Sequence, residues 1–266
     1  MSYILLIGLF CIGAIVGSFI NLARYRIPKK ESIISPGSFC DRCKTPLSLY
    51  QKIPIISSLF LFKECRICGY KPPEMYGLVE IFCGLLFVLN LISYKFLFTQ
   101  NIFTDYIFKS FFITFLLLIT LIDIDTLKIP NKINLCFYII GILMILFSTV
   151  DLFFNLEVII YRLFCSILIF LFIEVFSFLY FLVRKKIPIG TGDTKLISVL
   201  TIWLGPIGCI SSLVASIYFA GGYIFYSFIQ KKNIRSKFAF APFLSLGASL
   251  YLMIGPEFTS IIFLNK

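Results

Sequence analysis

Long apolar runs alternate with short polar segments along almost the whole chain. A bilayer core about 30 Å thick is crossed by roughly 20 residues of apolar helix. The pattern therefore predicts an all-α polytopic membrane protein with about eight transmembrane helices, of which the sixth and seventh are the least clearly separated. The apolar runs are residues 1–20, 76–98, 106–122, 133–150, 158–183, 196–209, 210–230 and 238–262.

One polar segment, residues 22–75, is much longer than the other connections. It contains six prolines and no apolar run of spanning length. We therefore expect three parts: a first transmembrane helix over residues 1–21, a small cytoplasmic loop domain over 22–75, and a transmembrane domain over 76–266.

The composition supports a membrane protein and excludes several kinds of catalysis. The chain has 266 residues, of which 59% are hydrophobic and 14% are charged, and its mean hydropathy is +0.99. Soluble domains carry about 25% charged residues. Because the chain contains no histidine, mechanisms built on Ser–His, Cys–His or His–metal pairs are excluded.

The basic residues predict the orientation in the membrane. Lys and Arg number 24 against 13 Asp and Glu, which gives a net charge of +11. Arg24 and Arg26 follow the first apolar run, and no charge precedes it, so this run is interpreted as a spanning helix whose C-terminal end is cytoplasmic. Eight spans then place both termini outside. The basic excess is assigned to anionic lipid headgroups, and no nucleic-acid partner is predicted.

Four of the nine cysteines form two C-x2-C pairs inside the loop segment. Cys40 and Cys43 are separated from Cys65 and Cys68 by 21 residues. Two such pairs present four thiolates to one ion, which is the ligand set of a closed, structural zinc site. Two disulfides or a redox C-x2-C pair are the alternatives, but a reducing cytoplasm disfavours disulfides and no thioredoxin-like unit surrounds the pairs. The other five cysteines are expected to be buried small hydrophobes.

Three aspartates lie where predicted spanning helices reach the cytoplasmic boundary. Asp123 and Asp125 end the third apolar run, and Asp193 follows Gly190 and Gly192 just before the sixth. Carboxylates at a membrane are costly, so each needs a reason. Residues i and i+2 point in different directions on a helix. Only one of the first two aspartates is therefore expected to face Asp193, and the glycines are expected to allow close backbone approach and an unusual turn.

Two carboxyl groups that share one proton can hydrolyse an amide bond. The ionised group takes a proton from water, and the protonated group polarises the carbonyl. Helix dipoles predict that Asp123 holds the proton and that Asp193 is ionised. The structural alternatives are that Asp193 caps its helix and that Asp123 or Asp125 is a solvated residue that pairs with Lys128. Glu174, inside the fifth run, is either functional or bonded to a hydroxyl of another helix.

Several ordered motifs closely resemble the type IV prepilin peptidase family of GxGD aspartic membrane proteases. They lie along most of the chain, and the cysteine quartet occupies the place where the family carries its own. The motifs are Gly17 to Asn21 (GSFIN), Tyr25 to Pro28 (YRIP), Asp123 to Asn131 (DIDTLKIPN), Gly190 to Leu196 (GTGDTKL) and Ala241 to Gly247 (APFLSLG).

The resemblance implies an enzyme with two activities. Asp123 and Asp193 would be the catalytic pair, and Asp125 a variable position. The implied substrate is a type IV prepilin or pseudopilin, whose short basic leader is cut after a Gly at the cytoplasmic face of the bacterial inner membrane. The resemblance also implies N-methylation of the new N-terminal residue, usually Phe, with S-adenosylmethionine, an activity associated with the four-cysteine loop.

Three departures from the family pattern lie in or beside that loop, at Asp41, at residues 51–52 and at residues 75–77. The peptidase activity is therefore better supported than methyl transfer. A non-catalytic, zinc-stapled membrane scaffold or assembly factor is the alternative from another class. A proton-relaying transporter would place its ionisable residues near mid-membrane, and preflagellin peptidases share the aspartate motifs but generally lack the four cysteines.

Overall fold

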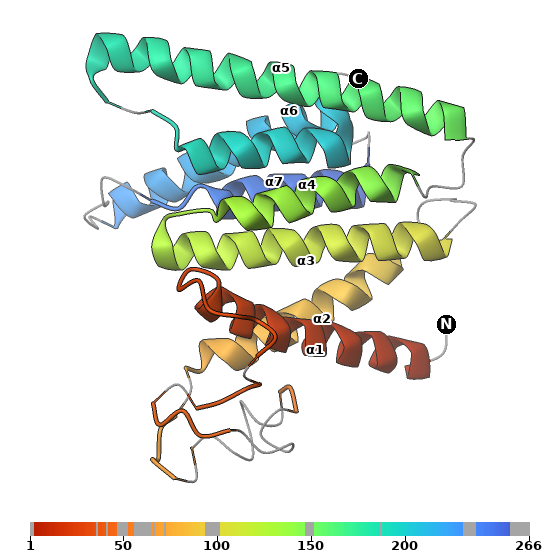
Figure 1. Cartoon of the computed structure of the whole chain (residues 1–266), viewed down its shortest axis with the longest axis vertical. Coiled ribbons are helices and arrows are strands. Elements are labelled where there is room, and N and C mark those ends of the chain that lie inside the picture. Colours follow the sequence, from red (N-terminus) through yellow and green to blue (C-terminus); the bar gives the residue numbers. More distant parts are fainter. Residues whose placement is uncertain are drawn as a thin grey trace. The chain divides into compact units, whose positions relative to one another are not determined.

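The secondary-structure elements in the described part of the chain are all α-helices (Figure 1). The computed structural model describes residues 3–35, 37–40, 42–46, 53–55, 65, 67–71, 73–93, 102–146, 152–186, 188–230 and 238–255. Within these ranges no β-structure occurs beyond one bridge between Phe39 and Pro46, so the all-α prediction is confirmed. The helices are α1 Tyr3–Arg26, α2 Met75–Ser93, α3 Ile102–Thr126, α4 Asn131–Leu146, α5 Leu152–Arg184, α6 Thr191–Ile229 and α7 Ala241–Ile254.

Five helices, α1, α2, α3, α5 and α6, are long and apolar enough to cross a membrane. The other two, α4 and α7, are also apolar but have only 16 and 14 residues. In contrast, α5 has 33 residues, which corresponds to about 50 Å of helix and exceeds a hydrocarbon core of about 30 Å. The described residues form seven helices rather than the eight expected, because the sixth and seventh apolar runs belong to one element, α6.

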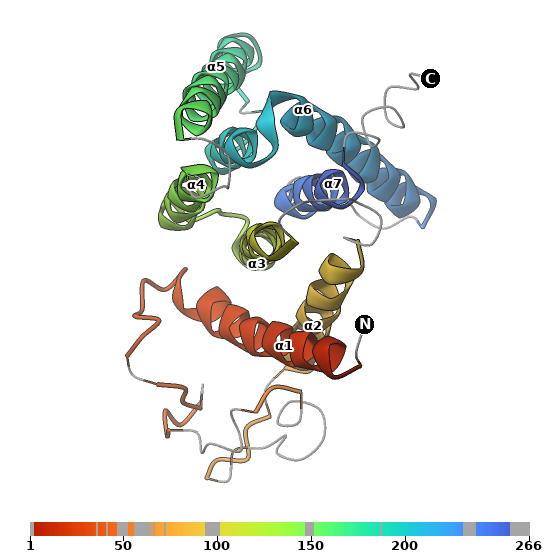
Figure 2. The same cartoon turned by 90° about the vertical axis from the view of Figure 1, so that its right-hand side faces the viewer.

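That element is nevertheless broken where the sequence suggested a boundary. Gly205 has φ 74 and ψ 170, which is not helical, and Pro206 follows it. The Cys209 sulfur lies 3.4 Å from the carbonyl oxygen of Ile197, whereas twelve residues of straight helix would separate them by about 18 Å. The two segments of α6 therefore bend back on each other at Gly205, and Figure 2 shows the sharp turn between them.

An arginine from α5 stabilises this break. The Arg162 guanidinium donates hydrogen bonds to the carbonyl oxygens of Ile202 and Trp203, at 2.8 and 3.1 Å. Carbonyls just before a break lose their partners in the next turn and need others. Arg162 therefore replaces those helical hydrogen bonds.

The chain divides into two compact units, residues 1–100 and 101–266. In the first unit, α1 and α2 approach closely at glycines. A Cβ atom at Gly17 would lie 2.8 Å from the Cα atom of Glu80, and one at Gly13 would meet α2 equally closely. Small residues four apart on a membrane helix permit this kind of backbone contact.

The second unit is a helix bundle around the first segment of α6. Figure 2 shows α3, α4, α5 and α7 on different sides of that segment. The α6 span is 67% buried, whereas the α5 span is only 6% buried. At the centre, the Trp203 indole N–H donates to the carbonyl oxygen of Phe137 at 2.9 Å, and its ring centre lies 5.3 Å from that of Phe112. These contacts join α3, α4 and α6 in the interior of the bundle, several turns away from the end of α3 and the start of α6, where the aspartates lie.

Candidate functional site

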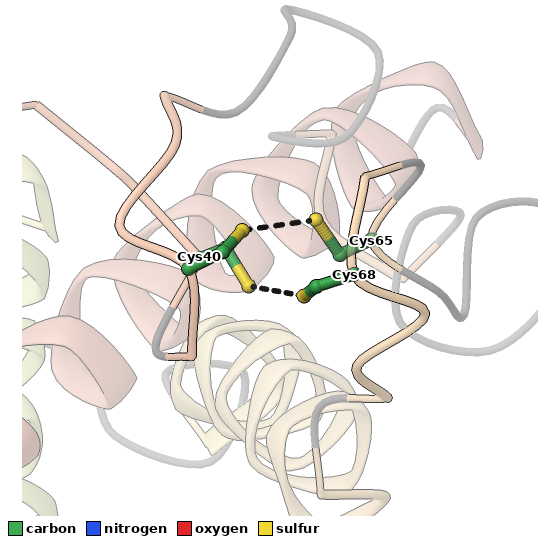
Figure 3. A group of neighbouring side chains, drawn as sticks. Cys40, Cys65 and Cys68 are labelled. Atoms are coloured by element: carbon green, nitrogen blue, oxygen red, sulfur yellow. Dashed lines mark hydrogen bonds between the residues drawn. The ribbon is translucent and has the colours of Figure 1, made fainter.

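The four cysteines of the loop in the first unit form one cluster, and Figure 3 shows sulfurs of the two pairs pointing toward each other. All four Sγ atoms lie within 4.8 Å of one another. Cys40 Sγ is 3.6 Å from Cys68 Sγ, and Cys43 Sγ is 3.6 Å from Cys65 Sγ. A tetrahedral zinc ion with Zn–S bonds of about 2.3 Å would place sulfurs about 3.8 Å apart. The four residues therefore fit a zinc ion, whereas a disulfide would require about 2.05 Å.

The two pairs sit on the same kind of backbone turn. In each turn, the N–H of the first cysteine donates to the carbonyl oxygen of the residue five positions later in the chain. The carbonyl oxygen of the same cysteine accepts from the N–H of the residue four positions later. The residue four ahead has a positive φ, 60 at Lys44 and 66 at Gly69. The four hydrogen bonds, all 2.8 to 2.9 Å, are Cys40 N to Thr45 O, Lys44 N to Cys40 O, Cys65 N to Tyr70 O and Gly69 N to Cys65 O.

Local hydrogen bonds favour the thiolate form at two of the four cysteines. Backbone hydrogen bonds from Cys68 and Ile67 lower the pKa of Cys65 to about 6. The pKa of Cys43 is also lowered, chiefly by the side-chain hydrogen bond with Thr45. At Cys68 a backbone hydrogen bond acts in the same direction, but burial and the neighbouring thiols outweigh it and raise the pKa to about 12. Because the thiolate is the form that binds metals, the cluster is chemically suited to a divalent cation.

Helices α1 and α2 anchor the loop that carries the cluster. The buried Arg26 at the end of α1 donates to the carbonyl oxygens of Ser32 and Gly37, both at 2.9 Å. Glu80 of α2, also buried, accepts the backbone N–H of Ile55 at 2.6 Å. Charged side chains at the helix surface thus tie irregular backbone to the first unit.

The other five cysteines only partly match the expectation of burial. Cys83 and Cys209 are buried, and Cys165 is half-buried. The prediction is wrong for Cys11 and Cys136, which are exposed. An apolar run in a membrane helix has a lipid-facing side as well as a packed side, so an apolar neighbourhood in sequence does not guarantee burial.

In the second unit, two of the three aspartates come together. Asp123, in the last turn of α3, is 5% exposed, and its Oδ2 accepts the backbone N–H of Ala241 at 3.1 Å. Asp193 lies in the first turn of α6, is half-buried, and interacts electrostatically with Asp123. Asp125 is exposed. The structure therefore brings Asp123 and Asp193 into one electrostatic environment and leaves Asp125 at the surface.

The glycines before Asp193 behave only partly as expected. A Cβ atom at Gly192 would lie 3.2 Å from the Cβ atom of Ile129, and one at Gly190 would lie 3.2 Å from Asp193 Oδ2. Close approach is thus confirmed. The unusual turn is not, because Gly190 has φ −68 and ψ 140, an ordinary extended conformation. Gly190 is also the residue that caps α6, without a side-chain hydrogen bond, so the interpretation of Asp193 as a helix cap is wrong.

Glu174 of α5 supports the turn that carries Asp193. The hydroxyl of Thr194, which is fully buried, donates to Glu174 Oε1 at 2.7 Å. This confirms the predicted bond to a hydroxyl of another helix. Helix α5 continues from Glu174 to Arg184, which is about 15 Å, and its side chains there are largely exposed and apolar. The first turn of α6 therefore packs against α5 about 15 Å before the C-terminal end of that helix.

Two groups near the aspartates were not found from the sequence. One is the amide of Ala241, because no local pattern reveals which helix end will meet Asp123. The other is Asn134 of α4, which is 4% exposed. A polar residue inside the apolar run 133–150 was the available signal for Asn134. The departures at Asp41 and residues 51–52 lie outside the described residues.

Taken together, fold and sites define a multi-pass helical membrane protein with a four-thiolate cluster in one unit and an aspartate pair in the other. Two family models match the chain: the bacterial Peptidase A24 N-terminal domain over residues 11–94, and the type IV leader peptidase family over residues 110–225. They jointly match about three quarters of the chain. The chain belongs to the type IV prepilin leader peptidase family, and it is a peptidase.

Curated relatives carry the name prepilin leader peptidase/N-methyltransferase. The relative from Legionella pneumophila is 29% identical over 94% of this chain and 91% of its own length. The one from Neisseria gonorrhoeae is 28% identical over 73% of this chain and 72% of its own length. The one from Myxococcus xanthus is 46% identical, but over only 30% of this chain and 24% of its own length. No solved structure matches the chain.

Proposed function

We propose that this chain is an aspartic endopeptidase that removes the short basic leader from type IV prepilins or pseudopilins, with Asp123 and Asp193 as the catalytic residues. The observation that carries the proposal is that the buried Asp123 and the half-buried Asp193, in terminal turns of α3 and α6, repel each other electrostatically. Both lie within residues 110–225, the region that matches the type IV leader peptidase family. The names of the relatives support the substrate class.

In the proposed reaction, one carboxylate takes a proton from a water molecule while the water oxygen bonds to the scissile carbonyl carbon. The second, protonated carboxyl group donates a hydrogen bond to the carbonyl oxygen, where negative charge develops. The C–N bond then breaks, and the nitrogen leaves as an amine after it receives a proton from the pair. This chemistry requires no histidine, metal or nucleophilic side chain.

The distribution of the shared proton needs a correction to the dipole argument. The dipoles of α3 and α6 alone would place the proton on Asp123. The structure adds the N-terminus of α7, whose Ala241 N–H donates to Asp123. A backbone donor at a helix N-terminus favours an anion, and it offsets the effect of the α3 C-terminus. We therefore propose that the pair shares one proton, without assigning it to Asp123 alone.

The membrane supplies the positioning in this proposal. The apolar helix of a prepilin would lie among the lipid-exposed helices, and its basic leader would stay in water on the cytoplasmic side. The reacting bond is then fixed at the depth of the aspartates, which is a positioning effect. The Lys and Arg residues at the helix ends support an orientation with the site at the cytoplasmic face and both termini outside, and they would contact anionic headgroups.

The four-cysteine loop has a supporting role in this proposal. Cys40, Cys43, Cys65 and Cys68 would hold a structural zinc ion that joins the two turns and leaves no open coordination position. We also propose that the protein methylates the new N-terminal amine. The methyl group of S-adenosylmethionine would move from sulfur to nitrogen, and the nitrogen would lose a proton. The relatives' names support this second activity.

Cleavage of a synthetic prepilin-type peptide in lipid vesicles tests the proposal. The peptide carries a short basic leader ending in Gly, followed by Phe and an apolar helix, and mass spectrometry reports cleavage and methylation together. Asp123→Asn and Asp193→Asn should each lower the cleavage rate about 10²- to 10⁴-fold. Asp125→Asn, at the exposed position, is the matched control and should cleave normally. Normal cleavage by Asp123→Asn and Asp193→Asn would refute the mechanism, and a wild type that does not cleave the peptide would favour the scaffold alternative.

A further inference from the structure

The side chain of Asn134 in α4 is buried without hydrogen bonds to any described residue. The residue is 4% exposed, and neither Oδ1 nor Nδ2 has a partner among the residues that the structure describes. Burying an unpaired amide is unfavourable, because the group gives up its hydrogen bonds to water and gains none in return. A polar group kept at such a cost suggests a partner that is not part of the folded chain.

The neighbours of Asn134 along α4 define the side of the helix on which it lies. Three residues before it, Asn131 Oδ1 accepts a hydrogen bond from Lys195 Nζ at 2.9 Å. Three residues after it, the Phe137 ring centre lies 4.9 Å from that of Trp203. Residues three apart share one face of a helix. Asn134 therefore lies on the face of α4 that meets α6.

The same contacts define its depth. Asp193 lies in the first turn of α6, and Lys195 follows it two residues later. Asn134 lies about one helical turn further into the bundle than the hydrogen bond between Asn131 and Lys195. The Phe137–Trp203 contact closes the bundle below it. Asn134 is thus between the level of the aspartate pair and the aromatic core.

We propose that Asn134 binds the main chain of the substrate on the C-terminal side of the cleaved bond. The proposal rests on the proposed function, because it takes the prepilin helix to extend inward from the aspartates. For hydrolysis, the start of that helix must unwind, which exposes N–H and C=O groups at membrane depth, where each needs a partner. A carboxamide offers one acceptor and donors side by side, and so matches a peptide group.

The first experiment separates binding from folding. Asn134→Leu, whose side chain has the same number of non-hydrogen atoms and the same branch at Cγ, should keep or raise the melting temperature, because it removes an unpaired buried amide. It should lower kcat/KM for the synthetic prepilin-type peptide about 10- to 100-fold. On the inactive Asp193→Asn background, Asn134→Leu should weaken binding of the uncleaved peptide to a similar extent. Tyr138→Phe, which changes a residue of the same helix as Asn134 and loses a hydroxyl bonded to Ser166 of α5, is the control and should cleave normally.

A second experiment changes the substrate and leaves the protein intact. Backbone esters are placed one at a time at the first positions after the cut, so that each removes a single N–H. At one position the ester should lower kcat/KM of the wild type, and the same ester should have little further effect on Asn134→Leu, as expected for a coupled pair.

The outcomes distinguish the two proposals. Wild-type kcat/KM for Asn134→Leu, or esters without effect at every position, would overturn the role of Asn134 while leaving the peptidase assignment intact. Failure of the wild type to cleave the peptide at all would overturn the proposed function, and the role of Asn134 with it.

Discussion

The four-cysteine cluster and the aspartate pair face the same electrostatic difficulty. Each gathers groups that repel one another when ionised, from two motifs far apart in the sequence. The cysteines lie on two similar turns outside the helices, where local backbone hydrogen bonds place them. The aspartates lie in terminal turns of α3 and α6, where tertiary contacts such as the Ala241 amide hold them.

The difference between the regions lies in what relieves the repulsion. Four thiolates require a cation, and a zinc ion with four sulfur ligands leaves no position for a substrate. Two carboxylates require only one shared proton, and their remaining lone pairs stay available for water. The four-cysteine cluster, which leaves no open coordination position, therefore fits a structural role, and the aspartate pair, whose lone pairs stay available for water, fits catalysis.

Removal of the metal should strongly destabilise the four-cysteine loop and have little effect on cleavage by the aspartate pair. Cys65→Ser, or a strong chelator under reducing conditions, should abolish zinc binding and make the loop of residues 22–75 sensitive to proteases, because metal binding contributes to the folding of such small segments. Cleavage by the aspartates should persist, since they belong to the other unit. Metal analysis, limited proteolysis and the peptide assay measure these effects.

The matched control is Cys11→Ser, which changes an exposed cysteine outside the cluster and should retain zinc. A folded Cys65→Ser protein that has lost all cleavage would break the comparison, since the cluster would then be needed for catalysis. A wild-type reduced preparation without zinc would remove the metal site altogether.

The features that local patterns specify could be predicted from the sequence. Apolar length predicts spanning helices because the bilayer sets that length, and two apolar runs were expected where the structure has the broken element α6. C-x2-C spacing predicted the cluster because each pair occupies one short turn. In the same way, the i to i+2 rule predicted that Asp123 and Asp125 would face differently, and one is buried while the other is exposed.

The features that depend on packing between distant elements could not be predicted. The Ala241 amide at Asp123, the support of Ile202 by Arg162 and the position of Asn134 each depend on which helices become neighbours. Apolar runs do not specify neighbours, because lipid and protein are equally apolar to them. The overhang of α5 beyond Glu174 was missed for the same reason.

The close contact of α1 with α2 tests whether the first unit depends on helix packing as well as on its metal. Gly17→Ala introduces a Cβ atom 2.8 Å from the Cα atom of Glu80, which forces the helices apart and should cost about 1–3 kcal/mol. Gly8→Ala is the matched control, since a Cβ atom there meets nothing within 4 Å. Thermal unfolding in detergent should show a lower melting temperature for Gly17→Ala alone, and equal melting temperatures would contradict the close approach.

The bond between Thr194 and Glu174 tests whether tertiary contacts position the aspartate pair. Thr194→Val removes the hydroxyl donor with little change of shape and should cost about 1–2 kcal/mol. It should also slow cleavage severalfold if the first turn of α6 shifts. Thr201→Val is the control, because the Thr201 hydroxyl donates to the carbonyl oxygen of Ile197 in its own helix, a bond that contributes little. A Thr194→Val enzyme with unchanged rate and stability would show that Asp193 is held without this bond.

The smallest effect should come from the backbone of the cysteine turns, where one position is occupied by Gly69 and its equivalent by Lys44. A left-handed conformation costs a residue with a Cβ atom about 1 kcal/mol, so Gly69→Ala should weaken zinc binding about fivefold. Space is not the cause, because a Cβ atom at Gly69 meets nothing within 4 Å.

Lys44 tolerates the same conformation while its ammonium lies 4.6 Å from the centre of the Phe39 ring, a contact that offsets part of the strain. Lys44→Gly relieves the strain but loses the contact, so its zinc affinity should change less than that of Gly69→Ala. Competition with a chelator measures both, and equal affinities for wild type and Gly69→Ala would show that backbone strain at this position does not influence the cluster.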